Sequence, residues 1–279
     1  MECDYSYGGP IGVFDSGYGG LTILERLRRQ MPEYDFIYLG DNARAPYGTR
    51  SFQVVYEFTR QAVRRLFRMG CPLVILACNT ASAKALRTIQ QIDLPDLDPS
   101  RRVLGVIRPT AECVGTITRS GHVGIVATPG TIRSNTYALE IAKFHPRLTV
   151  TGQACPLWAA LVENGETDSP GTDYFVGRDL RNLLNSDPLI DTIILGCTHY
   201  PLLLPLIRRH VPEHITLIPQ GDYVANSLKD YLQRHPEMET RLSKGGRVDY
   251  FTTEDSQGFS ASAALFLSEK VEAGHIALE

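Results

Sequence analysis

Two cysteines, Cys78 and Cys197, stand out because the sequence around them is alike. Each follows a short, continuous hydrophobic run, over residues 73–77 and 192–196, and each precedes small polar residues. Such runs are typical of strands buried on both faces of a parallel sheet, so each thiol is expected where a strand ends. Ligands bind at that edge of open α/β sheets. Two thiols at equivalent sheet edges therefore favour symmetrical chemistry on one ligand.

The polar neighbours bear on whether these thiols are reactive. Free cysteine is usually a small, buried, hydrophobic residue. After Cys78 and Cys197, however, hydroxyl and amide side chains and the start of a helix are expected to lower a thiol's pKa and to favour an anion site. The sequence thus predicts two reactive thiols. The remaining cysteines lack such surroundings and are assigned to the core or the termini: Cys3, Cys71, Cys113 and Cys155.

Two other kinds of site fit part of this pattern. Cys197 and His199 are both possible zinc ligands, but a zinc site needs two more, and no nearby Cys/His pair has zinc-site spacing. Acyl transfer needs one cysteine and one histidine, which leaves the second thiol without a role. We therefore expect no metal site.

A glycine-rich turn at residues 15–20 lies between a predicted strand at 10–14 and a predicted helix at 21–31. This is the usual position of a ligand-binding loop. A G-x-G-x-x-G dinucleotide fingerprint would need glycine at position 22, which is threonine. Asp15 and Ser16 suit a ligand site, and they equally suit a helix cap. The glycines are also explained by a tight strand-to-helix turn.

The elements that carry these residues occur twice. Thr128, at the end of a strand like the one before Ser16, follows it by 112 residues, and Cys197 follows Cys78 by 119. Two anchors in similar register indicate an internal duplication. With 279 residues, 43% of them hydrophobic, the chain has enough length and apolar material for two domains.

We predict an α/β protein of two similar three-layer domains with mainly parallel sheets, related by a pseudo-twofold axis, with the active site between them. The expected first domain is discontinuous and comprises residues 1–102 and 217–279, because the last strand and helix return to complete its sheet. The expected second domain comprises residues 103–216.

The charge balance excludes some partners. The net charge is −3, from 28 basic and 31 acidic residues, and there is no long basic run, so neither nucleic acid nor an anionic membrane surface is expected. The first residues lack the basic and apolar regions of a signal peptide, and no apolar stretch is long enough to span a bilayer. A cytoplasmic location is the expectation.

Taken together, the motifs resemble those of the glutamate racemases, within the aspartate/glutamate racemase superfamily. The resemblance covers nearly the whole chain and rests on six segments in order, at 12–20, 40–48, 77–81, 105–107, 128–131 and 195–202. It implies a cofactor-independent enzyme that interconverts L- and D-glutamate for peptidoglycan, usually as a homodimer. An aspartate racemase, another racemase of the superfamily and a non-catalytic amino-acid-binding protein are the alternatives.

The chemistry of that family matches the paired thiols. Inverting a stereocentre by proton exchange needs a base on one face of the carbon and an acid on the other. One thiol must be ready as thiolate while its partner stays protonated. By resemblance, Cys78 deprotonates D-glutamate, Cys197 deprotonates L-glutamate, and Asp15, Glu163 and His199 assist. The alternative for Glu163 is an exposed glutamate on a helix.

The same resemblance implies a substrate site without arginine or lysine. Backbone amides at turns, with hydroxyl and amide side chains, can hold a carboxylate without a full positive charge. The implied substrate-binding residues are Asp15, Ser16, Tyr47, Gly48, Asn79, Thr80, Thr198 and His199. Helix capping explains Thr128 and Thr131 about as well as ligand binding does.

Overall fold

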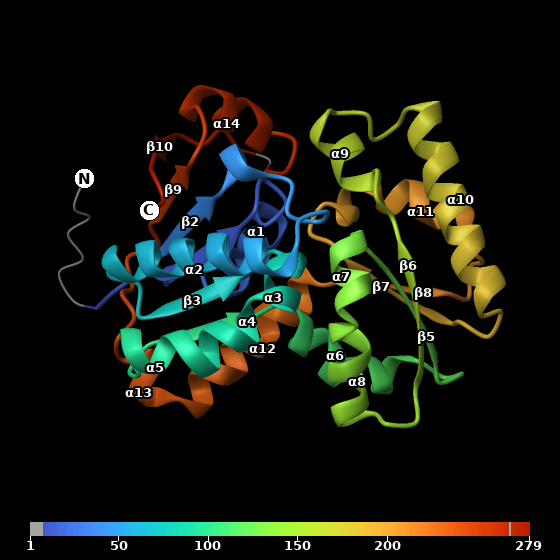
Figure 1. The fold of residues 1–279 in the computed structure, drawn as a ribbon, viewed down its shortest axis with the longest axis horizontal. Coiled ribbons are helices and arrows are strands. Elements are labelled where there is room, and N and C mark those ends of the chain that lie inside the picture. The colour runs from blue at the N-terminus through green and yellow to red at the C-terminus, as the bar shows by residue number, and fades with distance from the viewer. Residues whose placement is uncertain (1–7, 268) are drawn as a thin grey trace.

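The structure is a computed structural model that describes residues 8–267 and 269–279. Strands and helices alternate along the chain, and the strands form two sheets in which neighbouring strands are parallel. The two sheets lie side by side in Figure 1. The predicted α/β fold with two parallel sheets is therefore confirmed. Among the described helices, none is both long and apolar enough to cross a membrane. Cys3 lies outside the described residues.

The six-stranded sheet has the order β10-β9-β2-β1-β3-β4, and the four-stranded sheet has the order β6-β5-β7-β8. The first sheet contains β1 (Ile11–Asp15), β2 (Phe36–Gly40), β3 (Leu73–Leu76), β4 (Arg102–Gly105), β9 (Val248–Thr252) and β10 (Ala273–His275). The second contains β5 (His122–Ala127), β6 (Thr149–Ala154), β7 (Thr192–Gly196) and β8 (Thr216–Pro219). All residues of β1, β2, β3 and β7 are buried, as their uninterrupted hydrophobic runs predict.

The two sheets share one strand order. The run β2-β1-β3-β4 corresponds strand for strand to β6-β5-β7-β8, each numbered in chain order. Strands β3 and β7, which precede the two cysteines, occupy the same place in this order. This is the arrangement that an internal duplication predicts.

Helices cover both faces of each sheet, so each half has three layers. The α-helices are α1 (Leu21–Gln30), α2 (Phe52–Arg68), α3 (Asn79–Lys84), α4 (Leu86–Thr88), α5 (Leu94–Leu97), α6 (Ile107–Ile117), α7 (Pro129–Ser134), α8 (Thr136–Phe144), α9 (Trp158–Glu163), α10 (Pro170–Ser186), α11 (Leu204–His210), α12 (Gly221–Arg234), α13 (Pro236–Glu239) and α14 (Ser256–Ala263). Short turns are η1 (Asn42–Arg44), η2 (Ile89–Asp93) and η3 (Tyr200–Leu203).

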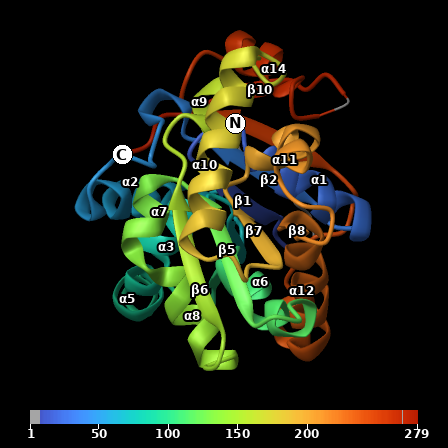
Figure 2. The same ribbon diagram turned by 90° about the vertical axis from the view of Figure 1, so that its right-hand side faces the viewer.

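The buried clusters show which helices face which side. Helices α1 and α12 pack on one face of the six-stranded sheet and α2 and α3 on the other. Helices α10 and α11 pack on one face of the four-stranded sheet and α6 and α8 on the other. Figure 2 shows α10 crossing in front of that sheet. Helix α2 shows why a helix turns one side to its sheet: the apolar residues Val55, Ala62 and Leu66 recur at helical spacing and are fully buried.

Sheet membership corrects the predicted assignment of two strands. Strand β4 pairs with β3 in the first sheet, although residues from 103 onward were assigned to the second domain. Strand β8 pairs with β7 in the second sheet, although residues from 217 onward were assigned to the first. The hydrophobic pattern identifies a strand, but distant partners decide which sheet it joins. We propose that the division between domains falls after Gly105 and after Pro219.

The end of the chain completes the first sheet, as expected. Strand β9 pairs with β2, and β10 pairs with β9. Helix α14 ends at Ala263, and residues that follow it pack into the core. Phe266 and Leu267 are both buried there. Strand β10 was not predicted, since three residues carry too little pattern.

Candidate active site

The two thiols sit at equivalent sheet edges. Cys78 follows β3 and is the N-cap residue of α3, and Cys197 follows β7 directly. Their exposed fractions are 5% and 7%. Negative charge on Cys197 contributes to raising the pKa of Cys78, after burial and the charge of Asp15, so the two thiols lie within electrostatic reach of each other. The duplicated strands thus bring both thiols toward one region between the halves.

Cys197 belongs to a chain of three side chains. Its Sγ lies 3.6 Å from His199 Nδ1, and His199 Nε2 lies 2.8 Å from Glu163 Oε1. Burial by itself would lower the pKa of the imidazole, but the hydrogen bonds with Cys197 and Glu163 raise that pKa well above its ordinary value. These bonds place a proton-carrying imidazole between the sulfur and the carboxylate. The reading of Glu163 as a solvent-exposed helix residue is wrong, since its carboxylate contacts His199.

Cys78 has different neighbours. Its Sγ lies 3.3 Å from Ser16 Oγ. Asp15 is fully buried, and its Oδ2 accepts a hydrogen bond from the Gly17 amide at 3.0 Å. The other carboxylate oxygen of Asp15 is buried without a hydrogen-bond partner. Burial raises the pKa of this carboxyl, although the charge of His199 opposes the rise.

The pKa of Cys78 contradicts one expectation. The neighbouring hydroxyl and helix start were expected to lower it, but burial, followed by the charge of Asp15, raises the pKa of Cys78 to about 12. The hydrogen bonds from Ser16 and the Ala81 amide offset this only in part. A buried thiolate loses the solvation of water, and at this thiol that loss dominates. The structure therefore holds Cys78 as a neutral thiol at neutral pH.

The glycine-rich turn brings the two halves into contact. A Cβ atom on Gly19 would lie 2.2 Å from Thr198 Oγ1 and 2.5 Å from His199 Nδ1. A Cβ atom on Gly17 would lie 3.2 Å from Glu163 Oε1. The glycines therefore permit close approach between the turn after β1 and the residues around Cys197, in addition to a tight turn.

The loop after β2 makes a second contact between the halves. The Gly130 amide donates to the Gly48 carbonyl at 2.8 Å. Thr80 Oγ1 lies 2.9 Å from Thr128 Oγ1 and 3.3 Å from Thr131 Oγ1. Thr128 also caps α7 by accepting from the Thr131 amide, so the capping reading is confirmed.

Two of the candidate binding side chains are already bonded within the protein. The Tyr47 hydroxyl donates to Asp41, a fully buried carboxylate that Arg44 also contacts. The Asn79 side chain is bonded to Gln220 and Tyr137. These hydrogen bonds hold both side chains within the protein. Asp41, Gln220 and Tyr137 were not among the candidate residues, because no local pattern marks a partner that is distant in sequence.

Aromatic residues cover the His199 side of the site. The Phe266 ring stands edge-on to the imidazole, with centroids 5.5 Å apart and an interplanar angle of 88°. Tyr18 stacks on Phe266 with centroids 6.1 Å apart and also contacts Phe259. The end of the chain thereby shields the imidazole from solvent.

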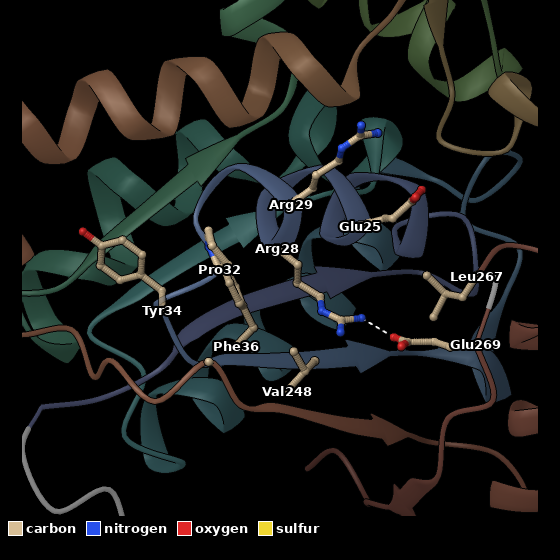
Figure 3. A pocket seen from close by; sticks show the side chains of 10 residues that line it. Glu25, Arg28, Arg29, Pro32, Tyr34, Phe36, Val248, Leu267 and Glu269 are labelled. Atoms are coloured by element: carbon tan, nitrogen blue, oxygen red, sulfur yellow. Dashed lines mark hydrogen bonds and ion pairs between the residues drawn. The ribbon is translucent and has the colours of Figure 1, made fainter.

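The cavity in Figure 3 is separate from the thiols. It has a volume of about 530 Å³ and lies between α1 and the first residues of β2 and β9, where Arg28 pairs with Glu269. In a parallel sheet this is the amino edge of the strands, opposite the edge that carries Cys78. The candidate site is instead narrow, because the two halves touch across it at Gly19 and Gly48.

Comparisons with known proteins agree with this geometry. The family model described as Asp/Glu/Hydantoin racemase matches residues 19–228. A glutamate racemase from Geobacter metallireducens is 38% identical, over 94% of this chain and 93% of that protein. One from Roseobacter denitrificans is 39% identical, over 94% of this chain and 98% of that protein.

Solved structures give the same result. The glutamate racemase isoform RacE1 from Bacillus anthracis has a TM-score of 0.88 at 35% identity, over 97% of this chain and 98% of that one. The glutamate racemase from Francisella tularensis, solved in complex with D-glutamate, has a TM-score of 0.84 at 32% identity, over 98% and 97%. The chain therefore belongs to the Asp/Glu/Hydantoin racemase family and is an amino-acid racemase.

Proposed function

We propose that this racemase interconverts L- and D-glutamate by proton transfer at Cα between two thiols, Cys78 and Cys197. The observation that carries the proposal is the unequal environment of two cysteines at equivalent sheet edges. Cys197 is beside an imidazole with a raised pKa, whereas burial keeps Cys78 protonated. One base and one acid are what a single inversion needs.

In the L-to-D direction, the Cys197 thiolate removes the Cα proton and the Cys78 thiol returns a proton from the opposite face. His199, held by Glu163 at 2.8 Å, stabilises the starting thiolate. The reverse direction starts from a Cys78 thiolate. For this step we assign Asp15 as the group that accepts the proton, because its carboxyl lies within electrostatic reach of Cys78 and has an unpartnered buried oxygen.

We propose that substrate carboxylates bind to backbone amides and hydroxyls around the thiols. The turns that carry Ser16, Gly48, Thr80 and Thr198 meet between the halves, which supports this assignment. Asn79 and Tyr47 contribute through their backbone, and His199 borders the same space. Such groups hold an anion without a full positive charge and leave Cα between the sulfur atoms.

We also propose that the enzyme supplies D-glutamate for peptidoglycan, that it is a homodimer and that it is cytoplasmic. These three proposals rest on the family resemblance. No cofactor is required, because the two thiols account for both proton transfers.

The test is racemisation of L-glutamate in deuterated water. Two opposed thiols predict that newly formed D-glutamate carries deuterium at Cα while the remaining L-glutamate is still protiated at early times. A single base would label both enantiomers together and would overturn the mechanism. Deuterium exchange at Cα of aspartate but not of glutamate would refute the assignment of glutamate as the substrate.

Serine variants test the thiols themselves. Cys78→Ser and Cys197→Ser should each lower kcat by orders of magnitude and leave the urea midpoint nearly unchanged, because serine is a far weaker base. Cys113→Ser is a matched control, since Cys113 lies on α6 and its thiol contacts the Thr110 carbonyl. Wild-type rates in either active-site variant would refute the assignment.

A further inference from the structure

A closed ring of three hydrogen bonds begins at the residue after Cys78. Asn79 Nδ2 donates to Gln220 Oε1, Gln220 Nε2 donates to the Tyr137 hydroxyl, and that hydroxyl donates to Asn79 Oδ1, each at 2.7 Å. The exposed fractions are 3% for Asn79 and Tyr137 and 2% for Gln220. Hydrogen bonds in such a buried chain polarise one another and hold their members rigidly.

One backbone group fixes the direction of this ring. Gln220 Nε2 also donates to the Val106 carbonyl at 3.0 Å, and a carbonyl can only accept. The Gln220 side-chain oxygen must therefore face Asn79, and Asn79 must donate to it from its side-chain nitrogen. The Asn79 oxygen is then left to accept from Tyr137. Each polar atom in the ring has one assignment, so the loss of any member leaves buried groups unpaired.

The ring joins elements that the sequence separates. Asn79 is the first residue of α3 in the first half, Tyr137 lies on α8 in the second half, and Gln220 lies between β8 and α12. Tyr137 also packs close to the backbone before the other thiol, because a Cβ atom on Gly196 would lie 3.1 Å from its ring. Gly196 directly precedes Cys197. Tyr137 thus touches the residue after one thiol and the residue before the other.

We infer that Tyr137 and Gln220 are positioning residues that hold the Cys78 turn at a fixed separation from the Cys197 turn. This inference rests on the proposed two-thiol function. Tyr137 acts as a spacer, with its ring against Gly196 and its hydroxyl on Asn79. Gln220 holds that hydroxyl in place by donating a hydrogen bond to it. The ring therefore fixes the backbone that follows Cys78, while Ser16 contacts its sulfur at 3.3 Å.

Tyr137→Phe is the decisive variant, because it removes the hydroxyl and keeps the ring against Gly196. It should release the Cys78 turn and leave the Cys197 turn in place. Gln220→Met removes the other partner with little change in side-chain length. Tyr34→Phe is the matched control, since Tyr34 is also buried and donates one bond, at 3.1 Å to Glu239, on the amino edge of the first sheet.

Three measurements are made on each variant: the urea midpoint, kcat and KM for both enantiomers, and the iodoacetamide alkylation rates of Cys78 and Cys197 from peptide masses. Tyr137→Phe and Gln220→Met should lower kcat by about 10- to 100-fold with KM little changed, because misplacement of a reacting group costs rate more than binding. The ratio of Cys78 to Cys197 alkylation should rise. The double variant should be no slower than either single one, since either change opens the same ring.

A merely structural ring gives a different result. Tyr137→Phe would then lower the urea midpoint as Tyr34→Phe does and leave kcat and the alkylation ratio unchanged, which would overturn the inference. A fall in kcat with an unchanged ratio would overturn it as well. If the serine variants at 78 and 197 are inactive and Tyr137→Phe is fully active, this inference alone fails. If the serine variants are active, the two-thiol function fails and the inference fails with it.

Discussion

Glu163→Gln isolates the effect of one charge on the His199 imidazole. The Glu163 carboxylate lies 2.8 Å from Nε2, and its side chain is 29% exposed. The amide of glutamine has nearly the same shape and can still accept a hydrogen bond. The variant therefore removes the negative charge and retains the contact, so its effect is electrostatic.

The magnitude follows from the geometry. Two charges at about 4 Å interact by about 4 kcal/mol at the effective dielectric of a protein surface. Because this carboxylate is partly exposed and screened by solvent, we take a third to two thirds of that value, or about 1.3–2.7 kcal/mol. This energy corresponds to a change of about 10- to 100-fold in the protonation equilibrium of the imidazole.

The sign determines which limb of the pH profile moves. Glu163 raises the pKa of His199. In the mechanism proposed above, the protonated imidazole stabilises the Cys197 thiolate. Removing the charge lowers that pKa, so the imidazole deprotonates at lower pH and activity is lost earlier as pH rises. The basic limb of kcat/KM should shift to lower pH by about one to two units, with a 10- to 100-fold loss of activity on that limb, since each unit is about tenfold.

The assay is a pH profile of L-glutamate racemisation for the wild type, Glu163→Gln and the control Glu166→Gln. Glu166 lies three residues further on, and its side chain is exposed. The control should keep the wild-type profile. An unshifted basic limb in Glu163→Gln, with folding intact, would refute the electrostatic role of Glu163.

Three further predictions follow from the geometry. Gly19→Ala should displace Thr198 and His199 and lower kcat about 100-fold, because the added Cβ would lie 2.2 Å from Thr198 Oγ1 and 2.5 Å from the imidazole. Gly171→Ala should keep the wild-type rate, because its added Cβ would meet only Ser169 Oγ, at 3.8 Å. Equal rates in the two variants would show that close approach at Gly19 is not needed. Alkylation of ligand-free Cys78 should keep accelerating up to about pH 12, where burial and Asp15 have placed its pKa, and a plateau near neutral pH would contradict that value. Phe266→Ala should expose the imidazole and lower the free energy of unfolding by about 3–5 kcal/mol in urea titrations, and a loss below 1 kcal/mol would mean that the ring contributes little cover.

The sequence by itself determined most of the elements and the positions of the paired cysteines. Continuous hydrophobic runs before Cys78 and Cys197 predicted buried strands, because burial on both faces leaves that pattern in any parallel sheet. The repeated turns after β1 and β5 predicted a duplication, and the two sheets share one strand order. Local composition encodes burial and periodicity, so these features needed no knowledge of partners.

Only the tertiary structure decided how those groups meet. It assigned β4 and β8 to their sheets through hydrogen bonds with β3 and β7. It raised the pKa of Cys78, because the dielectric around a thiol depends on everything packed against it. It joined Tyr137 and Gln220 to Asn79 across the two halves. Contacts between residues so far apart in the chain leave no mark in any single stretch of sequence, and they exist only once the chain has folded.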